Sequence, residues 1–282
     1  MPNRQGDGLV STKWLGDHLN SPDIKLVDAT WFMPDDGRDA RNEYERKHIP
    51  GAVYFDIDEI ADATSSLPHM APDAIKFSAR MRKLGLGDGS RVVVYDNNRL
   101  FASARVWWMF RRFGHTDVVV LDGGLAKWEL EGRALDELPR LPAERHFTAR
   151  ENTLLSRDLS QMRSALTDGA IQIIDARSPT RFRAMEPEPR PGLRAGHIPG
   201  SYNIYYRSLL NDDGTMLDRD DLTKIFGENG IRLDRPIVTT CGSGVSAAIL
   251  NLALYQLGVD DAAMYDGSWT EWGSQADTPI ET

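Results

Sequence analysis

The chain contains a single cysteine, Cys241, and the residues around it are those that activate a sulfur nucleophile. It lies between an apolar run and the expected start of a helix, in IVTTCGSGVSAAIL (residues 237–250). If the apolar run is a buried parallel strand, Cys241 stands at its carboxyl end, where open sheets present ligand sites. Gly242 and Gly244 permit a tight loop with inward-facing N–H groups, and the helix adds its positive end. The pattern predicts a thiol driven towards thiolate, the form that attacks.

Two other interpretations of this cysteine are weaker. Free cysteine is often a small buried hydrophobe, but a core cysteine needs no glycines beside it at a strand-to-helix turn. A cysteine phosphatase ends its loop with an arginine that clamps phosphate oxygens. This loop ends in Val245 and Ser246. We therefore expect a cavity that is neutral apart from its backbone amides and that suits a phosphate dianion poorly.

The elements that must position this loop are visible because the chain repeats itself. Segments of the first half recur in the same order in the second: KLVDA (25–29) as IQIIDA (171–176), KHIPGAVYF (47–55) as GHIPGSYNI (196–204), RVVVYD and ASARVWWMFRRFG as PIVTTC and SAAILNLALYQLG, and VVVLDGGLAKW (118–128) as AAMYDGSWTEW (262–272). The offset stays between 144 residues (118 to 262) and 149 residues (47 to 196). The sequence therefore predicts a duplicated domain, with Asp96 in the first half at the position of Cys241.

Each half alternates short apolar strands with helical segments, which predicts an α/β fold with a parallel sheet covered by helices on both faces. Residues 136–155 carry two prolines, many charges and no clear period, which is typical of an exposed linker. We place the boundary near residue 145. The expected domains are residues 1–145, which lack the nucleophile, and residues 146–282, which carry it.

Composition and charge exclude several classes of function. The net charge of −9 argues against nucleic acid as the main partner, because phosphate recognition needs a basic surface. No apolar run approaches the roughly 18 residues of a membrane helix and no secretory signal is visible, so we expect no membrane partner and a cytoplasmic location. One cysteine permits no internal disulfide and does not favour a thiolate zinc site. No nucleotide-binding motif occurs, and we expect neither metal nor cofactor.

Over nearly its whole length the chain resembles the rhodanese superfamily of sulfurtransferases. The resemblance is carried by HIPG in both halves, by the CGSGVS loop and by YDGSWTEW near the C-terminus. Thiosulfate-specific members typically carry CRKGVT, with two cations facing a dianionic donor, whereas CGSGVT is typical of members that use 3-mercaptopyruvate. The chain departs from the second pattern only at Ser246, which keeps a hydroxyl. The resemblance implies that Cys241 takes the sulfur of 3-mercaptopyruvate as a persulfide, releases pyruvate, and passes the sulfur to a thiol, thioredoxin or cyanide.

The resemblance also implies which residues bind the donor. The segment RFRAMEPEPRPG (181–192) is similar to the family's arginine-bearing loop, so Arg181 and Arg190 would hold the donor's carboxylate and carbonyl. Either arginine could instead be a surface cation in a polar loop. The rest of the expected binding site is the loop itself: Gly242, Gly244, Val245 and Ser246.

A Ser–His–Asp relay proposed for the family maps onto Ser243, His69 and Asp58, which would place the active site between the two domains. Ser243 would lie near the thiol, His69 would exchange the proton and Asp58 would orient the imidazole. His69 could instead be an ordinary loop histidine, and Asp58 could cap a following helical stretch.

Other matched residues are expected to be structural. His48 and His197 stand in the HIPG turns of both halves although only one half has the thiol, and Asp28 and Asp175 stand at matched strand ends. The large aromatics are expected to pack in the core or between domains: Trp107, Trp108, Trp269 and Trp272.

Two further functions stay open from the sequence. The chain could take thiosulfate as its donor through the same persulfide. It could also be a non-catalytic module that binds protein or relays sulfur, since Asp96 shows that the fold can lose its nucleophile.

Overall fold

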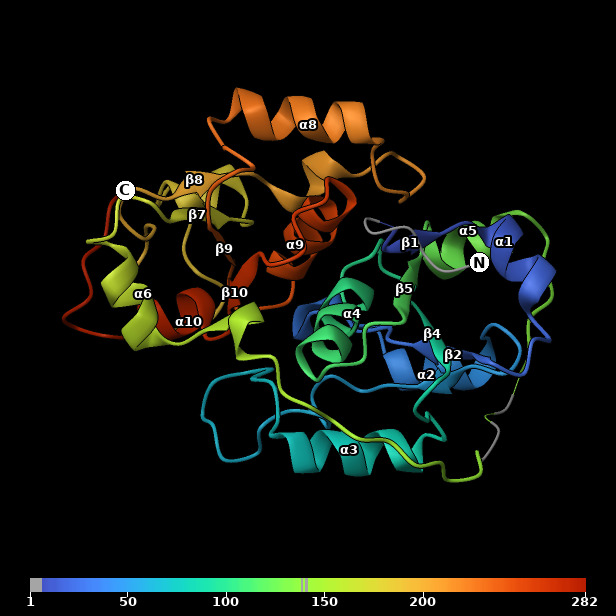
Figure 1. Ribbon diagram of the computed structural model, residues 1–282. Helices are drawn as coiled ribbons and strands as arrows, with labels where there is room; N and C mark the ends of the chain where they lie inside the picture. The colour runs from blue at the N-terminus through green and yellow to red at the C-terminus, as the bar shows by residue number, and fades with distance from the viewer. Residues whose placement is uncertain (1–6, 138, 140–141) are drawn as a thin grey trace.

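The computed structural model describes residues 7–137, 139 and 142–282, and these form two α/β domains of the same plan (Figure 1). Each domain contains a five-stranded sheet in which every pair of neighbouring strands is parallel. The first sheet consists of β1 (Leu9–Val10), β2 (Ile24–Asp28), β3 (Val53–Tyr54), β4 (Arg91–Tyr95) and β5 (Val118–Leu121). The second consists of β6 (Ser156–Arg157), β7 (Gln172–Asp175), β8 (Tyr202–Asn203), β9 (Ile237–Thr240) and β10 (Ala263–Tyr265).

The strand order is the same in both sheets, β1-β5-β4-β2-β3 in the first and β6-β10-β9-β7-β8 in the second. The predicted duplication is therefore confirmed at the level of topology. The outer strands β1, β3, β6 and β8 are two residues long. A strand of two residues is too short to show a recognisable pattern of apolar residues. The sequence therefore indicates only the three central strands of each half.

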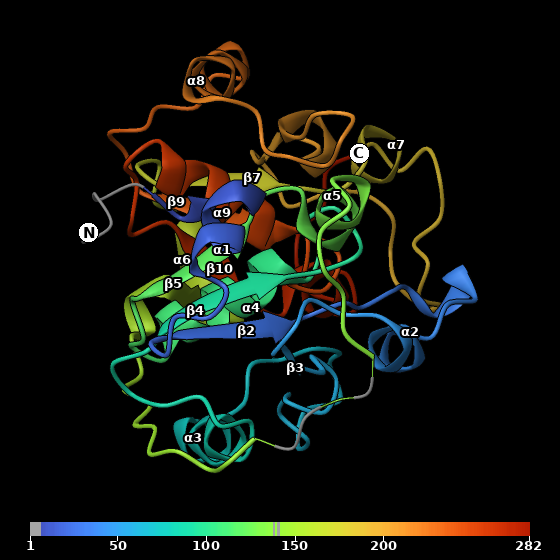
Figure 2. The same cartoon turned by 90° about the vertical axis from the view of Figure 1, so that its right-hand side faces the viewer.

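Helices cover both faces of each sheet, as predicted. In the first domain α1, α2 and α5 pack on one face and α3 and α4 on the other; Figure 2 shows α1 and α3 on opposite sides of the sheet. In the second domain α6 and α10 pack on one face and α8 and α9 on the other. The first-domain helices are α1 (Thr12–His18), α2 (Ala40–Arg46), α3 (Ala74–Lys83), α4 (Ser103–Arg112) and α5 (Gly124–Leu130). Those of the second are α6 (Leu159–Ala165), α7 (Pro179–Phe182), α8 (Arg219–Glu228), α9 (Ala247–Gln256) and α10 (Ser268–Trp272), and short 3₁₀ turns cover Pro34–Asp36, Thr153–Leu155 and Tyr206–Leu209.

The helix ends follow the local sequence signals. The Asp73 side chain accepts a hydrogen bond from the Lys76 N–H at the start of α3 (2.7 Å). Gly85, Gly114 and Gly258 follow α3, α4 and α9 with φ of 67°, 82° and 90°, the left-handed conformation that ends many helices. None of the helices in the described residues is long and apolar enough to cross a membrane.

The two domains meet through α4 and α9, which pack against each other at the centre of the molecule (Figure 1). Every residue from Ser103 to Phe110 of α4 and from Ala247 to Leu254 of α9 is buried. One continuous hydrophobic core runs from the first sheet through both helices to the second sheet. The two domains therefore share one hydrophobic core.

The segment after the first domain is not an exposed linker throughout, which corrects the expectation for residues 136–155. Phe147 is fully buried and its ring lies 5.8 Å from that of Phe77 in the first-domain core. The N–H groups of Arg150 and Asn152 donate to carbonyls at the end of α4. Positions 138, 140 and 141 lie outside the described residues. Because these contacts belong to the first domain, we propose a boundary near residue 152 in place of 145.

Candidate active site

Cys241 follows β9 directly, and α9 begins at Ala247, so residues 241–246 form the connecting loop. The cysteine is 2% exposed, and its N–H donates to Ser268 Oγ (3.2 Å), which lies 4.0 Å from the sulfur. Gly244 has φ of 74°, and a Cβ there would lie 2.7 Å from the Asp266 carbonyl oxygen. Only glycine satisfies both the conformation and the space.

The carbonyl groups of Cys241 and Gly242 accept hydrogen bonds, whereas the N–H groups of residues 242–246 have no acceptor among the described residues. Cys241 O accepts from the Trp269 N–H (2.9 Å), and Gly242 O accepts from the N–H and hydroxyl of Thr270 (2.9 and 2.7 Å). No acceptor among the described residues takes a hydrogen bond from the N–H groups of residues 242–246. Free N–H groups followed by a helix N-terminus are what an anion-binding loop requires.

The first domain shows what such a loop holds. Asp96 occupies the position of Cys241, and its buried carboxylate accepts from the backbone N–H groups of the loop that follows it. The four donors, at 2.8 to 3.1 Å, are Asn98, Leu100, Ala102 and Ser103. Burial raises the pKa of Asp96, and these N–H groups act against the rise. One copy of the loop thus holds a carboxyl group of its own, while the other places a sulfur at the same position.

A small pocket of about 40 Å³ surrounds the sulfur and is built by both domains. The first domain contributes three apolar side chains, Trp31, Met33 and Phe101. The second contributes the loop and the arginine segment: Cys241, Gly242, Ser243, Val245, Ser246, Arg181, Pro189 and Arg190. The structure therefore brings every predicted loop residue except Gly244 to the pocket wall, and Gly244 lies behind it against Asp266.

Arg181 and Arg190 make the pocket cationic, so the expectation of a neutral cavity is wrong beyond the loop itself. Arg181 donates to the buried carboxylate of Glu188, which also binds Arg177 (2.7 Å). Burial lowers the pKa of Arg190, and the nearby Cys241 opposes that lowering while Arg181 adds to it. The sequence indicated both arginines, but their approach to the sulfur depends on the fold of residues 181–192.

Asp58 and His69 form a close pair beside Arg190. His69 Nδ1 lies 2.6 Å from Asp58 Oδ1, and the Trp31 indole donates to Asp58 Oδ2 (2.8 Å). Burial acts to raise the pKa of Asp58, but His69, Trp31 and Arg190 outweigh it and the pKa is lowered. Arg190 Nη2 lies 3.4 Å from His69 Nε2. Because a guanidinium can only donate, His69 Nε2 must be the acceptor in this contact. We therefore assign the imidazole proton of His69 to Nδ1.

The predicted relay is only partly assembled. Asp58 and His69 are in contact, but Ser243 makes no hydrogen bond to His69 or to any other described residue. The nitrogen of His69 that would face the serine faces Arg190 instead. Ser243 lines the pocket with Cys241, and its role stays a prediction.

Arg105 of α4 links the cysteine loop to the first domain, and sequence reasoning missed it. Its side chain is fully buried, forms an ion pair with Asp266, and donates to Gly244 O (3.1 Å) and to His69 O. Asp266 also accepts from the Ala71 N–H (2.8 Å). One guanidinium therefore fixes the cysteine loop and the histidine loop together. The available signal was a charged residue inside the apolar stretch Ala104–Phe110 of the helix.

Comparison with known proteins decides the family. The model of the rhodanese-like domain matches the chain twice, at residues 11–131 and 158–275. The 3-mercaptopyruvate sulfurtransferase of Escherichia coli (strain K12) is 42% identical over 97% of both chains. The thiosulfate sulfurtransferase of Rattus norvegicus is 40% identical over 97% of this chain and 94% of its own. The chain belongs to the rhodanese family of tandem-domain sulfurtransferases.

The fold of this sulfurtransferase agrees with that relationship. The crystal structure of SseA from Escherichia coli, a 3-mercaptopyruvate sulfotransferase with the rhodanese fold, superposes with a TM-score of 0.86 at 39% identity. The match covers 93% of this chain and 99% of that one. Relatives named for either donor are about equally similar in sequence, so the donor must be argued from the site.

In this sulfurtransferase, Asp58→Asn should lower turnover by about tenfold or more, because the neutral amide removes the negative charge 2.6 Å from His69 Nδ1. The pKa of Asp58 lies below its usual value, so the wild-type carboxylate carries its charge at neutral pH and the substitution removes that charge. Turnover of both chains measured at neutral pH checks this expectation. Asp62→Asn is the control, since its side chain binds Thr64. Wild-type turnover in Asp58→Asn would argue against any role of the pair.

Proposed function

We propose that the chain is a 3-mercaptopyruvate sulfurtransferase. The observation that carries the proposal is the division of charge around Cys241. The loop contributes no cation and its N–H groups have no partner among the described residues, while Arg181 and Arg190 of the segment 181–192 line the same pocket. Two guanidinium groups match a planar carboxylate and the keto oxygen beside it, whereas thiosulfate has no carbon skeleton to reach from the sulfur to both.

The proposed reaction has two steps. The Cys241 thiolate attacks the donor's sulfur, the carbon–sulfur bond breaks, and the electron pair moves into the enolate of pyruvate, which takes up a proton. Arg181 and Arg190 stabilise the negative charge that develops on the keto oxygen. An acceptor thiolate or cyanide then attacks the outer sulfur of the persulfide and restores the Cys241 thiolate. The chain has no second cysteine, so the acceptor comes from outside, as a small thiol, thioredoxin or cyanide.

Gly242 supports this assignment because it makes room for Arg181. A Cβ at Gly242 would lie 2.9 Å from Arg181 Nη2. An arginine at this position, as in the CRKGVT pattern, would repel the Arg181 guanidinium and place its own charge on the loop. The glycine thus keeps the cations on the segment that we assign to the donor's carboxylate.

Gly242→Arg should therefore lower kcat/KM for 3-mercaptopyruvate by about tenfold and raise the ratio of thiosulfate to 3-mercaptopyruvate activity. The test is a side-by-side measurement of both donors, with pyruvate and thiocyanate as products and cyanide as the common acceptor. Gly169→Arg is a matched control, because the site of its Cβ is open.

Thiosulfate is the second candidate donor, favoured by the cationic pocket and by the 40% identity to the rat thiosulfate sulfurtransferase. A wild-type preference for thiosulfate in the same assay would overturn the proposal. Arg181→Ala should lose activity with both donors, and Arg183→Ala should keep both. That result would show that the Arg181 side chain in the pocket binds the donor, and that the overall charge of the segment does not account for binding.

A further inference from the structure

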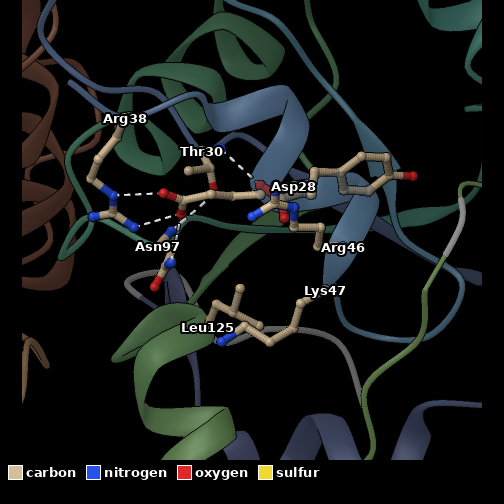
Figure 3. Close-up of a pocket in the computed structure, with 9 residues that line it drawn as sticks. Asp28, Thr30, Arg38, Arg46, Lys47, Asn97 and Leu125 are labelled. Carbon is tan, nitrogen blue, oxygen red and sulfur yellow. Dashed lines mark hydrogen bonds and ion pairs between the residues drawn. The ribbon is translucent and has the colours of Figure 1, made fainter. Parts of the chain in front are cut away.

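A second and larger cavity lies in the first domain at the carboxyl end of β2, and it shares no lining residue with the pocket around Cys241 (Figure 3). Its volume is about 330 Å³. In Figure 3 Asp28 and Thr30 lie on one side of it, and Leu125 and Lys47 lie on the other. The remaining lining residues are Arg38, Glu43, Tyr44, Arg46 and Asn97.

In the second domain the corresponding place is filled by a side chain, that of Arg177. Its guanidinium donates to both carboxylate oxygens of Asp175 (2.7 to 3.1 Å) and to Gly196 O (2.8 Å). It also lies over the ring of Trp269, 4.4 Å from the centroid. The Arg177 side chain is fully buried. This domain therefore holds a guanidinium in a site built from Asp175, a carbonyl and a flat apolar wall, with Glu188 as a second acid at 2.7 Å.

The repeat assigns first-domain counterparts that line the cavity to four of these residues, Asp175, Arg177, Gly196 and Trp269. Asp28 matches Asp175, and the Asp28 carboxylate accepts from the Thr30 N–H at 2.8 Å as Asp175 accepts from the Arg177 N–H at 2.9 Å. Thr30 therefore stands where the second domain has Arg177. The alignment of the HIPG and DG segments pairs the other two walls: Lys47 with Gly196, and Leu125 with Trp269.

Asp28 is left without the cation that its counterpart has. It is 1% exposed, and its Oδ2 has no hydrogen-bond partner of normal geometry among the described residues. Burial raises the pKa of Asp28 to about 6 despite the hydrogen bonds of Thr30 and Tyr95, so the carboxylate is ionised at neutral pH. A buried carboxylate without a counter-charge is costly, and a cation that donates hydrogen bonds relieves that cost.

The basic residues of the cavity do not supply this cation. Arg38 pairs with Glu43 through two hydrogen bonds, and Lys47 binds both oxygens of Glu129 (2.7 and 2.6 Å). Arg46 is exposed and is not among the groups that most affect the pKa of Asp28. The acid that stays uncompensated is Asp28, at the wall of the cavity.

From this geometry we propose that the first domain binds a small alkylguanidinium compound in this cavity, with its guanidinium on Asp28 in the place that Arg177 takes in the second domain. The planar fork of a guanidinium fits a carboxylate with two parallel hydrogen bonds, which an ammonium ion does not reproduce. The cavity is larger than the group alone, so an attached alkyl chain lies along Leu125. This site is independent of sulfur transfer, since none of its residues reaches Cys241.

The first test measures binding of n-propylguanidinium to the full chain by calorimetry at pH 8 and constant ionic strength. We expect saturable binding to the wild type and an affinity lower by about tenfold or more in Asp28→Asn, which keeps the acceptor for the Thr30 N–H. Propyltrimethylammonium has the same charge but no N–H donors, and it should bind at least about tenfold more weakly. Sulfur transfer should be unchanged in Asp28→Asn, so the test does not depend on the proposed function.

The second test builds the missing cation into the chain. Thr30→Arg restores the residue that the second domain carries, and its guanidinium should occupy the cavity, abolish n-propylguanidinium binding and raise the thermal midpoint. Arg46→Gln should bind as well as the wild type. No binding by the wild type, equal affinity in Asp28→Asn, or loss of binding in Arg46→Gln would overturn the proposal, the last result pointing to an anion site.

Discussion

Cys241→Ser should abolish sulfur transfer, lowering the rate of pyruvate release from 3-mercaptopyruvate by about 10³-fold or more. A serine hydroxyl is a far weaker nucleophile than a thiolate, and the chain has no other thiol that could take over. A mass spectrum after treatment with the donor should show one added sulfur atom on the wild type and none on the variant. The first measurement needs the purified protein, 3-mercaptopyruvate and a reduced thiol, and the second needs only the protein and the donor.

The stability of Cys241→Ser, compared with that of the wild type, serves as the control for this prediction. Serine keeps the Cys241 N–H donation to Ser268 and fits the loop, so the unfolding midpoint should match that of the wild type. Pyruvate release at the wild-type rate by Cys241→Ser would remove the mechanism. A wild-type chain that gains no sulfur from any donor would instead favour a non-catalytic binding module.

Arg105→Leu should lower the free energy of unfolding by about 3–5 kcal/mol, because it leaves the Asp266 carboxylate buried without its partner. The side chains of the pair are 0% and 5% exposed, so solvent cannot replace the lost contact. The same change frees the carbonyls of Gly244 and His69, which belong to the two loops at the active site. Turnover should therefore fall even at temperatures where the variant stays folded.

Denaturant unfolding of four chains tests this expectation: wild type, Arg105→Leu, Asp266→Leu and the double variant. The double variant should be more stable than the sum of the single losses predicts, since it removes both charges together. Arg163→Leu is the matched control, because Arg163 and Asp277 form an exposed pair. If Arg105→Leu is as stable as Arg163→Leu, the buried pair does not hold the domains together.

The duplicated sheets could be predicted because buried parallel strands leave apolar runs that survive in both halves. The same comparison located Cys241, since its loop differs from the Asp96 loop in the residues that matter for chemistry. The strand-to-helix turn is a local feature, and Gly244 with its positive φ is a local consequence of it. Sequence reasoning succeeds where the cause lies within a few residues.

The contacts between domains could not be predicted in the same way. Arg190 and His69 are 121 residues apart, and Arg105 and Asp266 are 161 apart. Their approach depends on how α4 packs against α9, and neither helix records that geometry in its own pattern. For the same reason the resemblance could suggest that Ser243, His69 and Asp58 act together, but not that His69 lies beside Arg190.

The pairing of α4 with α9 joins equivalent elements of the two repeats, as in a symmetric dimer whose subunits meet through the same patch. Here the two halves are parts of one polypeptide, so the docking of one domain onto the other is intramolecular. The connecting segment fixes the effective concentration of each domain at its partner. Dilution cannot separate Trp31 from Cys241. A pocket that needs both halves is therefore complete in every folded molecule, at any protein concentration.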